Sequence, residues 1–573
     1  MDTVTRYVES FVNGLYDGDV RNAVVCPGSR STPIALALLK KENIRVWVLY
    51  DERSAAFFAL GIGKSSSAPV ALVSTSGTAV ANFLPAVVEA KLSRVPMVVI
   101  TADRPPELRD FGAPQTIDQI RIYGTHAKWF QDMPIAADLP SLFRYSLLIG
   151  VRASYIARSS PAGPVHINFS FREPLLPETP PAPVESDGLE HVSITRVTGY
   201  PAAIDVETVA KEIRSGSRGI IVVGPGEYVR LRDELSELAR VLGWPILADS
   251  LSNLRHDEPP FGLVRCYESL LRNRAFRESN VPQWVIRLGD VPTSKELNTF
   301  CEGAKTIILD DGGDWRDPNL SLSRMVFGDP KVSLSLIAEA TKDFRSPPDW
   351  LAKWLDRDSR AIRRTDSLMK SMNEPFEGKL FHHLSKILNP TSPLTVVVGN
   401  SMPIRDLDSF FLNGSKNIHL VANKGASGID GLVSTAMGIS AFEGDVLLIL
   451  GDVSFYHDMN GLLASKLHSL NATILVVNNN GGGIFTFLPQ HSLPNQLFES
   501  LFGMAHELDF SGVKTIYGGE FHRVAKWQAF DKAFSTSIGA KGLKIIEFLA
   551  PDRDHNLLLH KRTFQDISSH VRS

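Results

Sequence analysis

The sequence DVLLILGDVSF at residues 445–455 and the sequence ATILVVNNNGG at residues 472–482 decide the fold. Each begins with a run of aliphatic and β-branched residues and ends in Gly, Asp, Asn or Ser, which is typical of a buried strand followed by a loop. The stretch between the two runs has the length of a helix. The pair therefore predicts a βαβ unit whose polar loops lie at the carboxyl edge of a parallel sheet, where ligands of open α/β sheets bind.

The same alternation of apolar runs and helix-length stretches continues along the whole chain. The runs form three groups, within residues 22–170, 219–312 and 394–549, with five, four and five members. A proline-rich stretch at 173–190 and the sequence Ser-Pro-Pro at 346–348 separate the groups, and both are typical of linkers. Because the βαβ rhythm predicts parallel sheets, we expect an α/β protein with three doubly wound, mostly parallel-sheet domains.

The length of the chain and the linkers place the domain boundaries. At roughly 150 residues per domain, the 573 residues predict three or four domains, and the three groups favour three. We expect domains at residues 1–180, 190–345 and 372–573, with a charged helix at 349–372 leading into the third.

Composition excludes several classes of protein. Hydrophobic residues make up 43% and charged residues 21% of the chain, which is ordinary for a globular protein. The 60 basic and 63 acidic residues give a net charge of -3, so no overall basic surface for nucleic acid is expected. Three distant cysteines indicate neither a disulfide framework nor a zinc site, and no targeting or membrane-spanning segment is recognisable. We therefore expect a cytoplasmic protein.

The loops of the two opening segments carry oxygen ligands suited to a hard cation. Mg²⁺ takes about six oxygen ligands and usually keeps phosphate oxygens and waters among them. Gly-Asp-Val-Ser at 451–454, followed by Asn-Asn-Asn-Gly-Gly at 478–482, resembles the thiamine diphosphate motif, in which GDG precedes NN. The resemblance implies that Asp452, Asn479 and the carbonyl of Gly481 bind Mg²⁺, for which Mn²⁺ can substitute. Either half alone would be an ordinary turn or loop.

A second requirement of the thiamine diphosphate family falls in the first domain. Thiamine chemistry needs a carboxylate that hydrogen-bonds the aminopyrimidine ring and promotes its imino tautomer, and in this family that Glu ends the second strand. Asp51 and Glu52 follow the apolar run at 45–50, so the resemblance implies that Glu52 is the catalytic residue. Since acidic residues are also favoured in the first turn of a helix, helix capping is the alternative role.

Further segments of both outer domains narrow the resemblance. They are CPGSRST (26–32), TSGTAVAN (75–82), TADRPPELRDFGAPQTIDQ (101–119), GNSMPIRDLD (399–408), ANKGASGIDG (422–431) and NNNGGGIFTFLP (478–489). Together they resemble the 2-succinyl-5-enolpyruvyl-6-hydroxy-3-cyclohexene-1-carboxylate synthase family. The resemblance implies a pyrimidine-binding first domain, a Rossmann-like central domain without an expected cofactor, and a diphosphate-binding third domain. It also implies a homodimer or homotetramer with active sites between subunits.

The reaction implied by the resemblance is a transferase reaction of menaquinone biosynthesis. With thiamine diphosphate and Mg²⁺, 2-oxoglutarate loses CO₂ and the resulting succinyl carbanion adds in a 1,4 sense to isochorismate. Both substrates are dicarboxylic acids, which Arg binds through a bidentate fork and Lys as a point charge. The cations at predicted strand ends or in the loops that follow are Arg30, Arg104, Lys295, Arg405 and Lys424.

The resemblance also assigns roles to individual side chains. Ser401 would lie beside the cofactor and, with Arg405, would hold the distal carboxylate of the unit derived from 2-oxoglutarate. Ile429 would be the apolar wedge under the bent cofactor, and Ile484 and Phe485 would wall the substrate pocket. The residues implied on the isochorismate side are Ser29, Arg30, Arg104, Gln115 and Lys295.

Three positions depart from the pattern of the family. Val453 replaces the second glycine of GDG, Lys424 stands where many relatives carry Arg, and Glu296 follows Lys295 where some relatives carry a second base. Lys424 keeps the positive charge and loses the bidentate fork. The departures at Lys424 and Glu296 bear on substrate affinity, whereas Val453 is a tolerated change in the metal-binding motif.

Two other functions fit parts of the sequence. Another thiamine diphosphate enzyme, such as an acetohydroxyacid synthase, an oxidase or a 2-oxo acid decarboxylase, would share the motifs, and some of these bind FAD on the middle domain. GIIVVGPGEY at 219–228 resembles the start of a dinucleotide loop but lacks the third glycine, so Gly224 and Gly226 are interpreted as a tight turn. Since a fold does not define a function, a non-catalytic or NAD-binding assembly is the other alternative.

Overall fold

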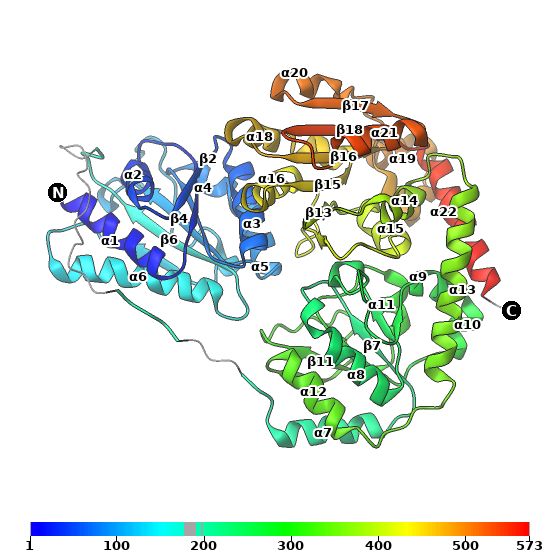
Figure 1. Cartoon of the computed structure of the whole chain (residues 1–573). Helices are drawn as coiled ribbons and strands as arrows, with labels where there is room; N and C mark the ends of the chain where they lie inside the picture. The colour runs from blue at the N-terminus through cyan, green and yellow to red at the C-terminus, as the bar shows by residue number, and fades with distance from the viewer. Residues whose placement is uncertain (1, 177–190, 196–198, 572–573) are drawn as a thin grey trace.

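The computed structural model describes residues 2–176, 191–195 and 199–571, and Figure 1 shows three α/β domains along the chain. Each domain contains one sheet of six strands, and every strand pair in the three sheets is parallel. The predicted fold class is therefore confirmed. The linker predicted at 173–190 lies mostly outside the described residues, and the domain boundaries stay predictions.

The first sheet has the strand order β2-β1-β3-β4-β6-β5. Its strands are β1 (Asn22–Val25), β2 (Arg45–Val48), β3 (Val70–Ser74), β4 (Met97–Asp103), β5 (Phe130–Met133) and β6 (Pro164–Ser170). Its helices are α1 (Thr3–Asp17), α2 (Thr32–Lys40), α3 (Glu52–Ser66), α4 (Thr78–Asn82), α5 (Leu84–Leu92) and α6 (Pro140–Arg158). The strands β3, β4 and β6 are buried along their whole length, because helices cover both faces of a parallel sheet.

The sheet of the third domain repeats this topology, with the order β14-β13-β15-β16-β18-β17. Its strands are β13 (Leu394–Val398), β14 (Ile418–Val421), β15 (Val446–Gly451), β16 (Ala472–Asn478), β17 (Glu520–Val524) and β18 (Leu543–Leu549). Its helices are α14 (Glu377–Ile387), α15 (Met402–Phe410), α16 (Leu432–Glu443), α17 (Asp452–His457), α18 (Leu463–His468), α19 (Asn495–Phe498), α20 (Val513–Tyr517), α21 (Trp527–Ser537) and α22 (Arg553–His570).

The middle sheet has a different order, β12-β11-β10-β7-β8-β9, which is the Rossmann order of two βαβ halves. Its strands are β7 (Gly219–Val223), β8 (Ile246–Ala248), β9 (Leu263–Val264), β10 (Trp284–Leu288), β11 (Lys305–Asp310) and β12 (Leu322–Phe327). Its helices are α7 (Ala203–Arg214), α8 (Arg232–Leu242), α9 (Tyr267–Arg272), α10 (Arg274–Ser279), α11 (Lys295–Cys301) and α12 (Pro330–Ala340). The predicted charged helix is α13 (Trp350–Ser371), which joins the middle and third domains.

Four strands were not expected from the sequence, and all four lie at sheet edges. They are β5, β9, β12 and β17. Three of them are only partly buried, and β9 has two residues. An edge strand needs no continuous apolar run, because one side of it has no neighbouring strand. The expectation of four or five strands per sheet was therefore too low.

The two outer sheets share a feature that positions a binding site. In each, the strand order reverses beside the first strand, between β1 and β3 in one and between β13 and β15 in the other. Such a topological switch point leaves a crevice at the carboxyl ends of the strands. Cys26 follows β1 and Asp452 follows β15, so the motifs quoted above lie at both crevices.

Helices α3 and α16 join the two outer domains, and Figure 1 shows them side by side. Residues Ser54–Gly63 of α3 and Leu432–Ala441 of α16 are all buried, and both helices belong to one apolar cluster that continues into both sheets. Glycines allow the close approach. A Cβ added to Gly61 would lie 2.1 Å from the backbone oxygen of Thr435, and one added to Gly438 would lie 2.0 Å from that of Phe58.

We predict that Gly61→Ala destabilises the protein by separating α3 from α16. A Cβ at this position would clash with the backbone of α16, at the oxygen of Thr435 and the nitrogen of Ile439. A side-chain rotation cannot relieve this strain, and overpacking of this kind costs about 1–3 kcal/mol. Urea unfolding would measure the loss. The control is Gly512→Ala, because nothing lies within 4 Å of a Cβ at that position. Equal stability of the two variants would contradict the interpretation.

Candidate active site

Asp452, Gly481 and Asn479 meet at the carboxyl edge of the third sheet. Asp452 is the first residue of α17 and is 2% exposed. Its Oδ2 accepts a hydrogen bond from the amide of Gly481 at 2.9 Å. Gly481 has φ of 131°, and a Cβ there would lie 2.3 Å from the carbonyl oxygen of Gly503, so this position requires glycine. The structure thus brings the predicted metal ligands together.

Asn479 is oriented by a residue that sequence reasoning missed. Its Nδ2 donates to Glu377 Oε1 at 2.9 Å, and its buried Oδ1 has no hydrogen-bond partner among the described residues. Glu377 is the first residue of α14 and is 1% exposed, and this burial raises the pKa of its carboxyl group. No local pattern marks Glu377, because its partner lies in a different segment of the chain.

A histidine contacts Asp452, and it is not one of the two histidines that lie nearest the motifs in the sequence. His506 Nε2 hydrogen-bonds Asp452 Oδ2 at 3.0 Å, and this bond raises the pKa of His506. His457 and His491 lie closer to the motifs in the sequence; the backbone oxygen of His457 accepts a hydrogen bond from Arg53, and His491 lies 3.8 Å from Asp554. The contact of His506 comes from a long loop, which gave no signal in the sequence.

Ser401 and Arg405 lie on the neighbouring loop and helix, after β13. Ser401 precedes α15 and has φ of 71°, an uncommon backbone conformation for a residue other than glycine and one found often at functional sites. Arg405 donates a 2.5 Å hydrogen bond to the carbonyl oxygen of Ser401. The guanidinium of Arg405 therefore bonds a neutral oxygen, and within the described residues it makes no ion pair.

The loop at 423–431 carries Lys424 and Ile429 and lies against the same edge. Asn400 holds it, because Asn400 Nδ2 donates to the carbonyl oxygens of Asn423 at 2.8 Å and Gly428 at 2.7 Å. The ammonium group of Lys424 makes no hydrogen bond or ion pair within the described part of the chain, and burial lowers its pKa. A half-buried, unpaired cation is available to an anionic ligand.

Ile484 and Phe485 lie in the short helix η6 (Gly483–Phe487) that follows the Asn479 loop. Both are half-buried, and the ring of Phe485 lies 5.3 Å from that of Phe502. These residues are therefore close in sequence and in space to the predicted metal ligands. Their placement is compatible with a pocket wall.

Glu52 occupies the first position of α3, at the carboxyl edge of the first sheet. The helix is capped by Asp51, whose side chain accepts from the amide of Ser54 at 3.0 Å. Glu52 itself is half-buried and makes no hydrogen bond or ion pair among the described residues. The capping alternative therefore applies to Asp51 and leaves the carboxylate of Glu52 free.

Arg104 and Gln115 meet at Ser76, in the loop after β3 of the first domain. Arg104 donates to the hydroxyl of Ser76 and, at 2.9 Å, to the carbonyl oxygen of Pro114, and Gln115 Nε2 donates to the carbonyl oxygen of Ser76 at 3.0 Å. Burial and then the charge of Arg30 lower the pKa of Arg104. Ser29 is exposed in the loop after β1, and its neighbour Arg30 donates to the carbonyl oxygen of Phe171 at 3.0 Å and lies 3.4 Å from Glu173.

Lys295 lies on the middle domain as the first residue of α11 and is exposed. It makes no ion pair or hydrogen bond among the described residues. Glu296 points to two arginines, Arg277 at 3.3 Å and Arg272 at 3.7 Å, so this departure from the family pattern serves the middle domain itself. No hydrogen bond or ion pair connects the Lys295 side chain to the described residues of the outer domains.

The glycines of the middle domain form the tight turn that was expected. A Cβ on Gly224 would lie 1.7 Å from the carbonyl oxygen of Asp290, and Gly226 has φ of 148° with the ring of Tyr228 beside it. Both positions therefore depend on glycine for close packing inside this domain.

Comparison with known proteins defines the class first. Residues 5–122 match the thiamine pyrophosphate enzyme N-terminal TPP binding domain, and residues 411–548 match the corresponding C-terminal TPP binding domain. The X-ray structure of a protein from Mycobacterium smegmatis, described as thiamin diphosphate-dependent, superposes with a TM-score of 0.69 at 17% identity. It covers 96% of this chain and 100% of that one, and it supports the fold.

The particular family follows from full-length relatives. The chain is 42% identical to 2-succinyl-5-enolpyruvyl-6-hydroxy-3-cyclohexene-1-carboxylate synthase of Geobacillus kaustophilus, covering 100% of this chain and 99% of the relative. It is 39% identical to the synthase of Listeria innocua, covering 100% and 98%. The chain belongs to this synthase family. It is therefore an enzyme with thiamine diphosphate-binding domains, and the family resemblance found in the sequence is confirmed.

Because the chain belongs to the synthase family, the two alternative functions considered from the sequence are not adopted: a different thiamine diphosphate enzyme and a non-catalytic assembly.

Among the described helices, none is both long enough and apolar enough to cross a membrane.

A buried carboxyl group, that of Asp458, lies at the end of α17 and contacts α16. Asp458 is fully buried and accepts hydrogen bonds from Ser434, from the amide at 2.7 Å and from the hydroxyl at 3.1 Å. Burial raises its pKa from 3.8 to about 7, although the hydrogen bonds and Arg53 oppose this rise. The folded protein therefore holds a proton there over a range in which the unfolded chain has released it.

We predict that Asp458→Asn flattens the pH dependence of stability. For a group whose pKa is raised on folding, the free energy of unfolding falls as pH rises from the unfolded to the folded pKa, here from 3.8 to about 7. Asn stays neutral throughout and keeps an acceptor for the amide of Ser434. Chemical unfolding at several pH values between 5 and 7 gives the slope of the unfolding free energy against pH. In the variant this slope should be less negative than in the wild type, by the equivalent of about one proton. A slope equal to that of the wild type would contradict the assignment.

Proposed function

We propose that this chain uses thiamine diphosphate and Mg²⁺ to decarboxylate 2-oxoglutarate and to add the remaining four-carbon unit to isochorismate. The products are 2-succinyl-5-enolpyruvyl-6-hydroxy-3-cyclohexene-1-carboxylate and CO₂, in menaquinone biosynthesis. The observation that carries the proposal is the buried, unpartnered Oδ1 of Asn479 beside Asp452, on a chain that belongs to the synthase family.

The donor set of the third domain fits a magnesium diphosphate. Asp452 supplies a carboxylate, Asn479 an amide oxygen that Glu377 leaves free, and Gly481 a backbone carbonyl. Hard oxygen donors of this kind suit Mg²⁺, whose remaining ligands are phosphate oxygens and water. We infer that Ser401 and Ile429 lie against the cofactor, because the two loops that hold them are tied together through Asn400.

Glu52 is the proposed catalytic residue. Bound thiamine diphosphate supplies the electron sink for decarboxylation. The free carboxyl group of Glu52 would hold a proton at the ring nitrogen of the aminopyrimidine, a role compatible with its half-buried position and its lack of other partners. Asp51 satisfies the helix terminus instead.

Most of the proposed substrate-binding cations are not paired with acids of the protein; the exception is Arg30, which lies 3.4 Å from Glu173. Lys424 and Lys295 make no hydrogen bond or ion pair among the described residues, and Arg104 and Arg405 bond neutral oxygens. Such groups retain their capacity for substrate carboxylates. We assign Ser401 and Arg405 to the distal carboxylate of 2-oxoglutarate. The residues assigned to isochorismate are Ser29, Arg30, Arg104, Gln115 and Lys295, and those assigned to the shared pocket are Lys424, Ile484 and Phe485.

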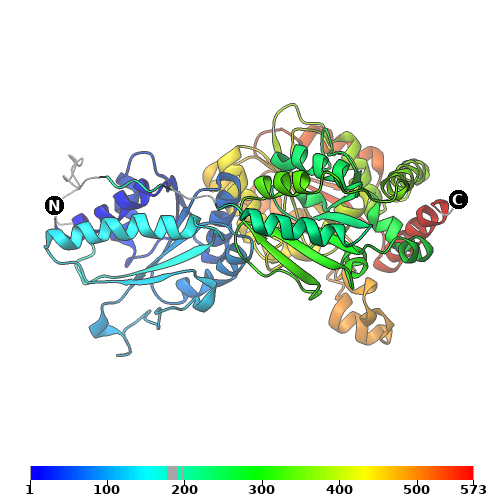
Figure 2. The same cartoon turned by 90° about the horizontal axis from the view of Figure 1, so that it is seen from below.

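We also propose that the chain self-associates and that each active site lies between two subunits. Both proposed half-sites have exposed apolar side chains at their rims: Phe111 is 83% exposed on the first domain, and Leu501 and Met504 are each 62% exposed on the third. Figure 2 shows both of these segments projecting on the same side of the chain. A second copy would cover them. The three free cysteines support the cytoplasm as the location.

The direct test mixes the protein with thiamine diphosphate, Mg²⁺ and 2-oxoglutarate, with and without isochorismate, and follows CO₂ and isochorismate. We expect both CO₂ release and loss of isochorismate. Glu52→Gln should lower turnover by about 100-fold or more while the thermal unfolding midpoint and cofactor binding stay near those of the wild type. CO₂ release without consumption of isochorismate would identify a plain decarboxylase, and a fully active Glu52→Gln variant would exclude the catalytic role.

Complementation of two inactive variants tests the shared active site. A dimer of one Glu52→Gln chain and one Asp452→Asn chain has two active sites if each site forms between subunits. One of the two sites then contains both wild-type residues, and the other contains both substituted residues. Statistical mixing of subunits by co-expression should therefore restore about a quarter of the wild-type activity. Each variant alone is the control. If both residues of a site come from one chain, the mixed preparation stays inactive.

A further inference from the structure

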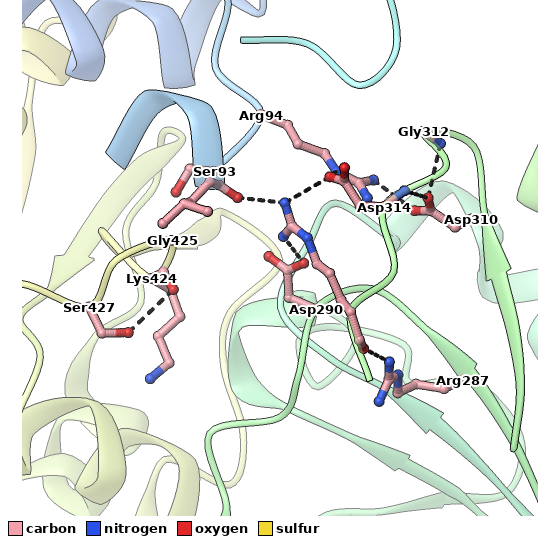
Figure 3. A network of polar contacts seen from close by, with 12 residues as sticks. Ser93, Arg94, Arg287, Asp290, Asp310, Gly312, Asp314, Lys424, Gly425 and Ser427 are labelled. Atoms are coloured by element: carbon pink, nitrogen blue, oxygen red, sulfur yellow. Dashed lines mark hydrogen bonds and ion pairs between the residues drawn. The ribbon is translucent and has the colours of Figure 1, made fainter. Parts of the chain in front are cut away.

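Besides Asn400, residues of the first domain hold the loop at 423–431. Gly425 packs against the end of α5, and a Cβ there would lie 2.8 Å from the Cβ of Leu92 and from the amide nitrogen of Ser93. Figure 3 shows Gly425 and Lys424 beside Ser93, with the Lys424 side chain extending away from this contact. A loop that carries two proposed ligand-binding residues is thus packed between two domains.

The carboxylate of Glu89, on α5, captures two consecutive amides of this loop. Glu89 Oε1 accepts from the amide of Gly425 at 3.0 Å, and Oε2 accepts from the amide of Ala426 at 2.6 Å. The hydroxyl of Ser93 also donates to Oε1 at 2.5 Å. Glu89 is 2% exposed. Hydrogen bonds from amides to a buried carboxylate are charge-assisted and are stronger than hydrogen bonds between neutral groups.

Lys64, in the last turn of α3, completes the arrangement. Its Nζ lies 3.7 Å from Glu89 Oε1 and donates to the carbonyl oxygen of Ala422 at 3.0 Å. Burial lowers the pKa of Lys64, while the charge of Glu89 opposes this effect. Glu89 thus binds the amides at one point of the loop, and Lys64 binds the carbonyl just before the loop begins.

The middle domain holds the end of α5 in place (Figure 3). Arg316 donates to the carbonyl oxygen of Leu92 at 2.7 Å. Arg94 forms ion pairs with Asp310 at 2.8 Å and Asp314 at 3.1 Å. These contacts leave the segment after Glu89 little freedom to move, so Glu89 is a rigid support for the loop.

We propose that Glu89 and Lys64 are positioning residues that set where the 423–431 loop presents Lys424 to a dicarboxylate substrate. The proposal rests on the proposed function, because it needs Lys424 to bind a substrate. Glu89 is too deeply buried and too fully bonded to act on a ligand itself. It acts through the backbone of the loop, so its removal should change substrate affinity more than the rate of the chemical steps.

The test compares Glu89→Gln with Glu9→Gln. Glu9 also pairs with a lysine of the first domain, Lys40 at 2.8 Å, and its side chain is 9% exposed, but it belongs to α1 and does not contact the loop. In Glu89→Gln, hydrogen exchange at the amides of Gly425 and Ala426 should become faster by about tenfold. The KM for one substrate should rise by about tenfold, with kcat changed by less than about threefold. Glu9→Gln should change neither the exchange at these amides nor KM.

A double variant shows whether the effect passes through Lys424. Lys424→Ala should raise the same KM, and adding Glu89→Gln to it should change that KM by less than about twofold. If Lys424→Ala raises KM while Glu89→Gln alters neither exchange nor KM, the positioning role is wrong and the substrate role of Lys424 stands. If Lys424→Ala leaves both KM values unchanged, the substrate role of Lys424 fails, and the positioning proposal fails with it.

A second variant covers the case in which Glu89→Gln does not fold. Gly425→Ala keeps Glu89 and Lys64 but forces the loop away from Ser93. It should raise the same KM, and this rise should disappear in the Lys424→Ala background. A folded Gly425→Ala enzyme with wild-type KM values for both substrates would overturn the proposal.

Discussion

The contact between α3 and α16 is the constraint on which the arrangement of the outer domains depends. Gly61 and Gly438 let the two helices approach to a distance that any side chain would prevent. Polar contacts at both ends of α3 follow from this approach. Lys64 in the last turn reaches Ala422, and Arg53 in the first turn reaches the backbone of His457 at 2.8 Å. Apolar packing in the centre thus sets the geometry of polar groups at the edges.

The cations of the chain divide into two groups by the partners they have. Arg94, Arg109 and Arg255 form ion pairs with aspartates at 2.7–3.1 Å, and these pairs hold segments or domains together. Arg104 and Arg405 bond neutral oxygens, and Lys424 has no partner among the described residues. A protein with a net charge of -3 can therefore still present positive charges that its own acids do not neutralise, and a dicarboxylate substrate requires such charges.

The central strands and the residues at their carboxyl ends could be predicted from the sequence, because both are local signals. Asp452 and Asn479 each follow a continuous apolar run, and the parallel pairing of β15 and β16 brings the two loops together. The edge strands β5, β9, β12 and β17 were missed, since they lack a continuous apolar run. Glu377 and His506 were missed for another reason: their partners lie far away in the chain, and no spacing records such a contact.

The middle domain shows why a domain without a cofactor motif can still matter to the proposed site. Asp249, at the end of β8, accepts the amide of Thr293, two residues before Lys295. The next residue, Ser250, donates its amide to Asp408 at 3.0 Å, and Asp408 belongs to α15, which also carries Arg405. Asp408 is further held by Arg255 at 2.7 Å. Two proposed substrate cations on different domains are therefore connected through adjacent residues of one loop. Since a buried ion pair is worth little as stability but restricts geometry, we interpret this connection as fixing the relative position of the two charges.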